Sequence, residues 1–287
     1  MQELVDAVNG VVWSQALIFL CLGVGLYFSL RTRFLQLRYL KQMVCLMVEG
    51  KADGQGVSSF QALSISLSGR VGTGNIAGVA AAITFGGPGA VFWMWVVAFL
   101  GASSAFVEST LAQIYKEREG NQYRGGPAYY IEKGLGVKWY AWAFAIVTIL
   151  ATGVLLPGVQ SNSIASSMES AFGVARSVTA AVLVLLMGTI IFGGVRRIAR
   201  VAEVVVPFMA LGYILVAFVI LALNLDRVPG ILSLIVESAF GLQAGFGAMV
   251  GMAIMWGVKR GVFSNEAGQG TGPHPAAAAH VSHPAKQ

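Results

Sequence analysis

The chain has 287 residues, of which 56% are hydrophobic and only 11% are charged, and its formal net charge is +6 at pH 7. A soluble domain is about one quarter charged, so this composition excludes an ordinary soluble protein and indicates an all-α polytopic membrane protein. The basic residues lie between the apolar runs, which favours contact with a lipid bilayer over contact with nucleic acid.

The N-terminal part predicts one membrane helix and one surface helix. Residues 11–30 form an apolar run of the roughly 20 residues that a spanning helix needs. Glu3 and Asp6 precede it in place of lysines, so we expect a retained helix and not a cleaved signal peptide. The apolar residues of 34–49 recur at three- and four-residue spacing with Arg38 and Lys41 between them, which predicts an amphipathic helix on the membrane surface. Residues 51–56 predict a polar turn.

Residues 58–85 predict a membrane helix that is broken at its middle. The apolar run is interrupted by residues 69–75, which read GRVGTGN. Unwound backbone is tolerated in a bilayer only where it is buried in protein or lines a cavity, so the break predicts a site. Arg70 needs a partner at that depth. We expect either a structural ion pair with one of the acids Glu108, Glu203 and Glu266, or a role in coupling or gating.

The two ends that meet at this break suit ligands of opposite charge. We expect the second half-helix to begin near Asn75, so that the free N–H groups of Thr73, Gly74 and Asn75 favour a carboxylate. The unpaired carbonyl groups from Ser68 to Val71 suit a hard cation such as Na⁺. The alternative is a glycine hinge or a packing motif, since Gly74 and Gly78 are spaced as G-x-x-x-G.

Further apolar runs predict five more spans, and the basic residues between them predict an orientation. The expected spans are residues 90–114, 139–168, 175–192, 201–223 and 244–257, separated by a polar loop (115–138), a basic loop (193–200), a turn (224–227) and an amphipathic or re-entrant segment (229–242). Every lysine and arginine except Arg70, Arg176 and Arg227 falls on one side if the N-terminus faces out. The positive-inside rule therefore predicts seven crossings, with the N-terminus outside and the C-terminus inside.

Two later segments add candidate site residues. Gln160 follows Pro157 in the middle of an apolar run, where an amide must either bond across helices or bind a polar ligand. Trp256 is either an interface residue or the wall of a pocket, since its position before Gly257 and residues 263–268 is compatible with a second broken helix. His274, which shares the C-terminal tail with two other histidines, is not expected to bind a metal, because we expect that tail to lack a scaffold. No set of nucleophile, base or paired carboxylates indicates an enzyme.

Four runs carry a resemblance to a known family: SGRVGTGNIAGVA, GGPGAVFWMWVVAFLGASSAFVESTLAQIYKER, YRGGPAYYIEKGLG and WGVKRGVFSNEAGQGTGPH. The chain resembles, over nearly all of its length, the alanine or glycine:cation symporters, also called sodium:alanine symporters. The resemblance implies sodium-coupled symport of small neutral amino acids, alanine or glycine, across the bacterial inner membrane. It also implies a LeuT-type fold of two inverted five-helix repeats.

The resemblance assigns roles to individual residues. It implies that the amides of Thr73 and Gly74, within the stretch from Gly72 to Asn75, bind the substrate carboxylate, and that the carbonyl groups of Ser68 and Val71 hold Na⁺. Because Arg70 stands where some LeuT-type proteins build a second sodium site, one Na⁺ per cycle is expected. Gln160 would lie on the third core helix and Trp256 on the sixth, with Trp256 and Phe263 excluding large side chains.

The same resemblance divides the chain and raises a question of length. It implies a peripheral part (1–57), a first repeat (58–224), the start of a second repeat (225–271) and a cytoplasmic tail (272–287). The family continues with about four further helices, so we expect the 287 residues to be a fragment that does not transport alone. Proton coupling, another small amino acid, or a channel or non-transporting membrane scaffold remain the alternatives.

Overall fold

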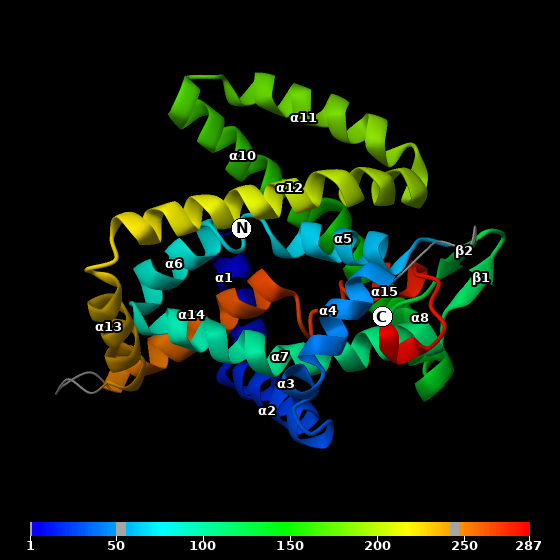
Figure 1. Cartoon of the computed structure of the whole chain (residues 1–287), viewed down its shortest axis with the longest axis horizontal. Helices are drawn as coiled ribbons and strands as arrows, with labels where there is room; N and C mark the ends of the chain where they lie inside the picture. Colours follow the sequence, from blue (N-terminus) through cyan, green and yellow to red (C-terminus); the bar gives the residue numbers. More distant parts are fainter. Residues whose placement is uncertain (1, 50–55, 242–246) are drawn as a thin grey trace. The chain divides into compact units, whose positions relative to one another are not determined.

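The computed structural model describes residues 2–49, 56–241 and 247–287, which are helical apart from one short hairpin and the connecting turns (Figure 1). The predicted turn at 51–56 and the junction between the segments 229–242 and 244–257 lie largely outside the described residues. The elements are α1 (Gln2–Val12), α2 (Gln15–Arg31), α3 (Leu35–Arg38), α4 (Leu40–Glu49), α5 (Ser59–Arg70), α6 (Ala77–Gly86), α7 (Gly89–Ile114), β1 (Glu117–Glu119), β2 (Gln122–Arg124), α8 (Pro127–Tyr130), η1 (Ile131–Leu135), α9 (Lys138–Leu150), η2 (Ala151–Leu155), α10 (Leu156–Phe172), α11 (Arg176–Ile191), α12 (Gly194–Leu223), α13 (Val228–Phe240), α14 (Gly247–Asn265), α15 (Pro273–Ala278) and η3 (Pro284–Lys286).

Within the described part of the chain, four helices are long and apolar enough to cross a membrane: Ala7–Arg31, Gly89–Ile114, Lys138–Phe172 and Gly194–Leu223. Three shorter apolar helices are Ala77–Gly86, Arg176–Ile191 and Val228–Phe240. These helices confirm a multi-pass helical membrane protein, whereas the number of crossings and their orientation stay predictions.

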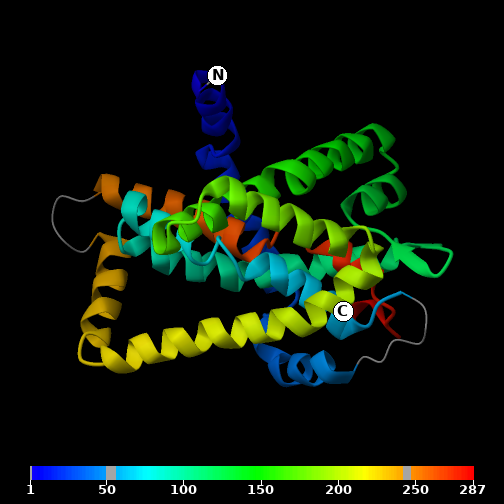
Figure 2. The same ribbon diagram turned by 90° about the horizontal axis from the view of Figure 1, so that it is seen from above.

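Two predicted loops are wrong. The basic segment 193–200 is helical from Gly194 onward and forms the first turns of α12, because arginine and alanine are strong helix formers and residues 195–200 contain neither glycine nor proline. The polar segment 115–138 contains the antiparallel hairpin of β1 and β2, then α8 and the π-helical η1. The hairpin is the green arrow pair in Figures 1 and 2.

Contacts divide the chain into two units, and each broken helix is divided at its break. Unit 1 comprises Met1–Gln42, Gly74–Val107 and Leu211–Gln269, and unit 2 comprises Met43–Thr73, Glu108–Ala210 and Gly270–Gln287. The half-helix α6 packs on α14 in unit 1, and the half-helix α5 packs on α15 in unit 2. The chain thus contains two broken helices, α5–α6 and α14–α15. Each half of one packs on a half of the other within the same unit.

In unit 1, α14 packs on α7 through glycines at a four-residue spacing. A Cβ added at Gly257 would lie 2.7 Å from the carbonyl oxygen of Ala90, and one at Gly261 would lie 3.3 Å from the Cα of Met94. The residue numbers increase in the same direction along both helices, from Gly257 beside Ala90 to Gly261 beside Met94, so the two helices run parallel. Their close approach is the kind that small residues permit. Ile18 of α2, Val97 of α7 and Val258 of α14 are buried together beside this contact.

The parallel run corrects the expected end of the last span. The helix α14 continues past Gly257 to Asn265, so Lys259 and Arg260 lie within it, level with the first two turns of α7. They do not lie in a loop that follows a span, so these two cations do not support the predicted orientation with the C-terminus inside.

In unit 2, the residues expected to form an unscaffolded tail are docked on the rest of the unit. Gln113, 5% exposed at the end of α7, donates through its side-chain amide to the carbonyl oxygens of Ala276 and, at 3.0 Å, of Ala279. Lys116 donates to the same Ala279 oxygen at 2.7 Å, and burial lowers its pKa to about 8, so it stays largely protonated at neutral pH. Val57, which precedes α5, pairs with Ala279 in a parallel bridge.

Gln113→Ala should lower the free energy of unfolding by about 2 kcal/mol, because the carbonyl groups of Ala276 and Ala279 each lose one donor and the buried amide that links them is removed. Thermal unfolding of the purified chain in detergent, followed by circular dichroism, measures the change. Gln122→Ala in the hairpin is the control, because no hydrogen bond of its side chain occurs among the described residues. Equal stability of the two variants would show that the amide of Gln113 does not hold the segment.

Candidate functional site: two helix breaks

The first break lies where the sequence predicts it. The helix α5 ends at Arg70, and its cap Val71 has extended backbone with φ −112° and ψ 97°. The half-helix α6 begins at Ala77, two residues later than predicted, so its free N–H groups belong to Ala77 and the two residues after it. Gly72 to Asn75 form the turn between the two half-helices.

In unit 2, the break lies beside Gln160. A Cβ added at Gly72 would lie 3.6 Å from both the amide nitrogen and the amide oxygen of the Gln160 side chain, which projects from the second turn of α10. Among the described residues this amide forms no hydrogen bond, so it does not bond across helices there. The hydroxyl of Thr73 is also buried without a partner in the described part of the chain. The structure therefore brings three of the predicted substrate residues together in this unit.

The predicted sodium ligands lie at the end of α5. The last helical bond runs from the N–H of Val71 to the carbonyl oxygen of Leu67, so the carbonyl groups of the final turn, from Ser68 on, have no helical donor. The hydroxyl of Ser68 turns away and donates to the carbonyl oxygen of Ile65 at 2.6 Å. Backbone oxygens, and not side chains, are thus the groups that α5 offers to a cation.

Arg70 occupies the same end of α5 and forms none of the ion pairs found among the described residues. A Cβ added at Gly272 would lie 2.9 Å from its guanidinium nitrogen Nη2, and its Nε is buried without a partner in the described part. The ion pair expected between Arg70 and Glu203 is therefore not formed among the described residues. Glu203 accepts a hydrogen bond from the side chain of Gln61 at 2.9 Å.

In unit 1, the break lies beside the end of α14. The hydroxyl of Ser264 donates to the side-chain oxygen of Asn75 at 2.5 Å. A Cβ added at Gly74 would lie 3.0 Å from the Cα of Ser264 and 3.4 Å from the ring of Phe263. The structure therefore places Gly74, Asn75 and Phe263 side by side, together with Ser264, which was not among the predicted site residues.

A second break follows α14 at Asn265, within the predicted residues 263–268, whereas the predicted end of the span at Gly257 is wrong. The helix continues through Gly257 and Phe263, because the glycines there serve close packing on α7 and do not unwind. It ends at Asn265, and the turn that follows contains three positive φ angles, 55° at Glu266, 79° at Gly268 and 82° at Gly270, before Pro273 opens α15. The alternation of glycine in GQGTGP was the available signal, since glycine tolerates these angles.

This second break also presents polar atoms that lack partners. The side-chain nitrogen Nδ2 of Asn265 and the side-chain oxygen Oε1 of Gln269 are buried, and neither has a hydrogen-bond partner among the described residues. Buried polar atoms without partners are rare in native proteins and indicate a missing ligand, ion or water.

Trp256 lies away from the breaks. Its ring stacks on Phe85 at 4.7 Å between centroids, and its Cβ would lie 2.7 Å from a Cβ added at Gly86. Phe85 and Gly86 end the ten-residue helix α6, about 15 Å from the residues that begin it after the break. The structure thus separates Trp256 from Phe263 and Asn75, with which the sequence analysis grouped it.

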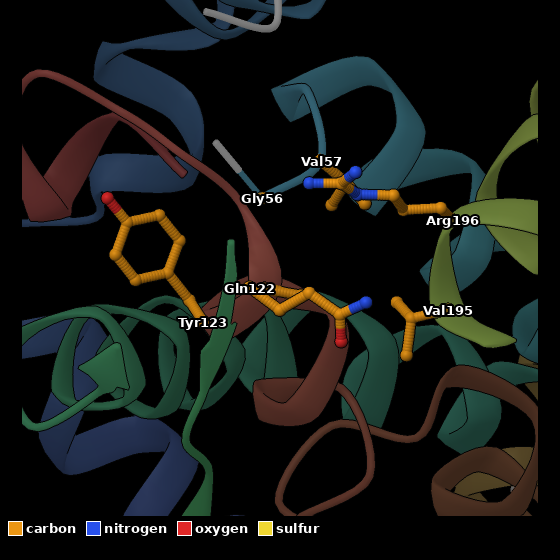
Figure 3. A pocket seen from close by; sticks show the side chains of 7 residues that line it. Gly56, Val57, Gln122, Tyr123, Val195 and Arg196 are labelled. Atoms are coloured by element: carbon orange, nitrogen blue, oxygen red, sulfur yellow. The ribbon is translucent and has the colours of Figure 1, made fainter. Parts of the chain in front are cut away.

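A small hollow that is partly open to solvent lies elsewhere in unit 2. Figure 3 shows Arg196 reaching from the start of α12 toward Val57, with Gln122 and Tyr123 of the hairpin on the other side. The guanidinium of Arg196 donates to the carbonyl oxygen of Asn121 at 3.0 Å. The lining residues are Gly56, Val57, Gln122, Tyr123, Val195, Arg196 and Ala278, and none belongs to a helix break.

Comparison with known proteins places the chain in a family. Residues 1–287 match the sodium:alanine symporter family. YrbD of Bacillus subtilis (strain 168), provisionally named a sodium/proton-dependent alanine carrier protein, is 63% identical over 287 residues, which is 100% of this chain and 59% of YrbD. GlnT of the same organism, provisionally named a sodium/glutamine symporter, is 50% identical over 289 residues, covering 100% of this chain and 60% of GlnT.

A third relative is the sodium/proton-dependent alanine carrier protein of Bacillus sp. (strain PS3), 52% identical over 245 residues, which cover 85% of this chain and 55% of the relative. The chain thus spans between 55% and 60% of the length of these three curated relatives. Because the family match covers every residue, this chain belongs to the sodium:alanine symporter family, whose members are membrane transporters and not enzymes.

Proposed function

We propose that this protein takes part in sodium-coupled symport of small neutral amino acids, alanine or glycine, across the inner membrane. The observation that carries the proposal is the first helix break, whose two sides offer different chemistry. The end of α5 offers carbonyl oxygens without helical donors, and the turn and the start of α6 offer N–H groups. A hard cation prefers the first and a carboxylate the second.

The residues around the break have distinct proposed roles. The backbone N–H groups of Gly72 to Asn75 and of the first turn of α6 bind the substrate carboxylate, and the amide of Gln160 binds a second polar group of the substrate. The carbonyl groups of Ser68 and Val71 coordinate Na⁺. Phe263, which lies beside Gly74, limits the size of the substrate side chain.

The pairing of half-helices supports a LeuT-type arrangement as part of this proposal. In such folds, discontinuous helices from the two repeats form the substrate site. Here α6 packs on α14 and α5 packs on α15, so each half of one broken helix contacts a half of the other. The repeat boundaries at residues 58, 225 and 272 are proposed on the same basis.

Equilibrium binding of radiolabelled alanine to the purified chain in nanodiscs tests the proposal. We expect binding in NaCl that weakens at least about tenfold in KCl, because Na⁺ is the proposed co-ligand. Uptake by the protein at its native length in proteoliposomes, driven by an inward Na⁺ gradient, tests transport itself. Sodium-independent binding with uptake driven by a proton gradient would favour the proton-coupled alternative.

The name of the relative GlnT makes a larger amide substrate the second candidate to test. Competition of unlabelled glutamine against bound alanine separates the two candidates. Phe263 lies within van der Waals distance of Gly74, so we expect alanine and glycine to compete and glutamine to compete poorly. Stronger competition by glutamine than by alanine would reassign the substrate.

Gln160→Ala should weaken alanine binding by about tenfold, the effect of losing one hydrogen bond to a charged group. The same equilibrium assay measures the affinity. Asn162→Ala removes an exposed amide two residues further along α10 and is the matched control. Unchanged affinity in Gln160→Ala would return Gln160 to a packing role.

A further inference from the structure

Two adjacent cations in α14 share one aromatic ring. The ammonium nitrogen of Lys259 lies 5.2 Å from the ring centroid of Trp256, and the guanidinium carbon of Arg260 lies 5.3 Å from it. Lys259 also lies 5.5 Å from the ring of Trp13. Neither cation forms an ion pair with any acid among the described residues.

The position of these cations makes the missing counter-charge significant. They lie level with the first turns of α7, which is apolar enough to span a membrane. Cations that are half-buried between helices cost free energy unless an opposite charge compensates them. Attraction to an aromatic face compensates only part of the desolvation of two cations.

Two buried N–H donors point to the missing partner. The indole nitrogen Nε1 of Trp256 and the Nε of Arg260 are both buried, and neither has an acceptor among the described residues. They belong to the same aromatic–cation contact, so one acceptor group could serve both. An anion would satisfy the two donors and the two positive charges together.

The geometry points to a carboxylate site formed by Trp256, Lys259 and Arg260, and we propose that it binds the carboxylate of an amino acid before that substrate reaches the break. This inference rests on the proposed function. Arg260 precedes Phe263 by three residues and Ser264 by four, so it lies on the same side of α14, one turn away from the contacts with Gly74 and Asn75.

The surroundings favour a soluble carboxylate over the phosphate of a lipid. The Trp256 ring is covered by Phe85, and all three side chains of the site are half-buried between helices of unit 1. The planar guanidinium of Arg260 can bind a carboxylate through two parallel bonds. The side chain of Phe85 offers no polar group. The site would therefore recognise the carboxylate of an amino acid but not its amino group.

Propionate is the direct probe, because it has the carboxylate but not the amino group of alanine. Its binding to the purified chain, in nanodiscs of uncharged phosphatidylcholine, is followed by saturation-transfer NMR, with propylamine as the ligand without a carboxylate. We expect propionate and not propylamine to bind, with affinity reduced about tenfold in Arg260→Gln. Trp256→Phe keeps the stacking on Phe85 and should reduce affinity by a smaller factor, about threefold.

Arg227→Gln is the matched control, because Arg227 is an exposed arginine of the same unit. Circular dichroism of each variant establishes that it is folded, and Arg260→Lys, which keeps the charge, provides a second variant if Arg260→Gln is not. Equal propionate affinity in Arg260→Gln, Arg227→Gln and the unaltered chain would overturn the proposal. So would Arg260-dependent binding of glycerol phosphate without binding of propionate, since the site would then belong to a lipid headgroup.

The outcomes separate this site from the proposed function. If propionate binding depends on Arg260 while alanine binding does not depend on Na⁺ or Gln160, the anion site stands and the symport proposal fails. If alanine binding behaves as proposed while propionate binding ignores Arg260, only the carboxylate site is removed.

Discussion

Gly74→Val is expected to weaken alanine binding by at least about a hundredfold while the chain stays folded. A Cβ at this position would lie 3.0 Å from the Cα of Ser264 and 3.4 Å from its neighbour's carbonyl oxygen, so backbone and not a flexible side chain must move. Overpacking of this kind costs about 1–3 kcal/mol, which the turn can relieve by separating Ser264 from Asn75. That movement displaces the N–H groups proposed to bind the carboxylate.

Equilibrium alanine binding in Na⁺ measures this effect, and a graded series sharpens it. Gly74→Ala, which adds one methyl group, should give an intermediate affinity. Gly23→Val in α2 is the control, because its added side chain would meet no described atom within 4 Å. Full affinity in folded Gly74→Val would show that the turn is a packing motif and not a binding site.

Gly257→Val is expected to cause the largest loss of stability, about 3 kcal/mol in the free energy of unfolding. Its Cβ would lie 2.5 Å from the Cβ of Trp93 and 2.7 Å from the carbonyl oxygen of Ala90, so α14 and α7 would have to separate. The same contact leads to the buried cluster of Ile18, Val97 and Val258, which a separation would loosen.

Thermal unfolding in detergent measures that loss, with a control on the same helix. Gly251→Val has the same change in helix propensity, but its side chain would meet no described atom within 4 Å. We expect Gly251→Val to stay within about 0.5 kcal/mol of the unaltered chain. Equal destabilisation by both variants would attribute the effect to helix propensity and not to the contact with α7.

The first break could be predicted from the sequence because its signal is local. A glycine-rich, polar interruption of an apolar run conflicts with a continuous membrane helix, and Gly72 to Asn75 indeed form the turn. Its neighbours Gln160 and Phe263 could be named from polarity and resemblance. Ser264 could not, because its bond to Asn75 depends on the antiparallel packing of α6 on α14, which no local pattern reveals.

The predicted end of the last span at Gly257 is wrong because glycine has two uses in a membrane helix. Gly257 suggested unwinding, but there glycine permits close approach to α7, and the chain unwinds only after Asn265. The basic loop before α12 was misjudged for a related reason. Charge density identified a membrane boundary but not a helix end, and the arginines after Gly194 continue the helix.

The docking of the C-terminal residues was also beyond local pattern. A segment of alanines and prolines has little amphipathic signal, and its order comes from Gln113 and Lys116, more than 150 residues earlier in the chain. Long-range donors to backbone carbonyl groups leave no periodic trace in the segment that accepts them.

The central claim is that the turn between α5 and α6 holds the substrate, and protection of Thr73 tests it most directly. Thr73 lies in this turn and is only half-buried, so a cysteine there should react with a small thiol reagent at a rate that depends on the ligand. The free cysteines Cys21 and Cys45 are first replaced by serine. Thr84→Cys, exposed near the far end of α6, serves as the control.

Alanine with Na⁺ is predicted to slow the labelling of Thr73→Cys severalfold, alanine with K⁺ to have little effect, and Thr84→Cys to react at one rate throughout. Equal labelling rates of Thr73→Cys with and without bound alanine, in Na⁺, would contradict the claim that the substrate lies at this break.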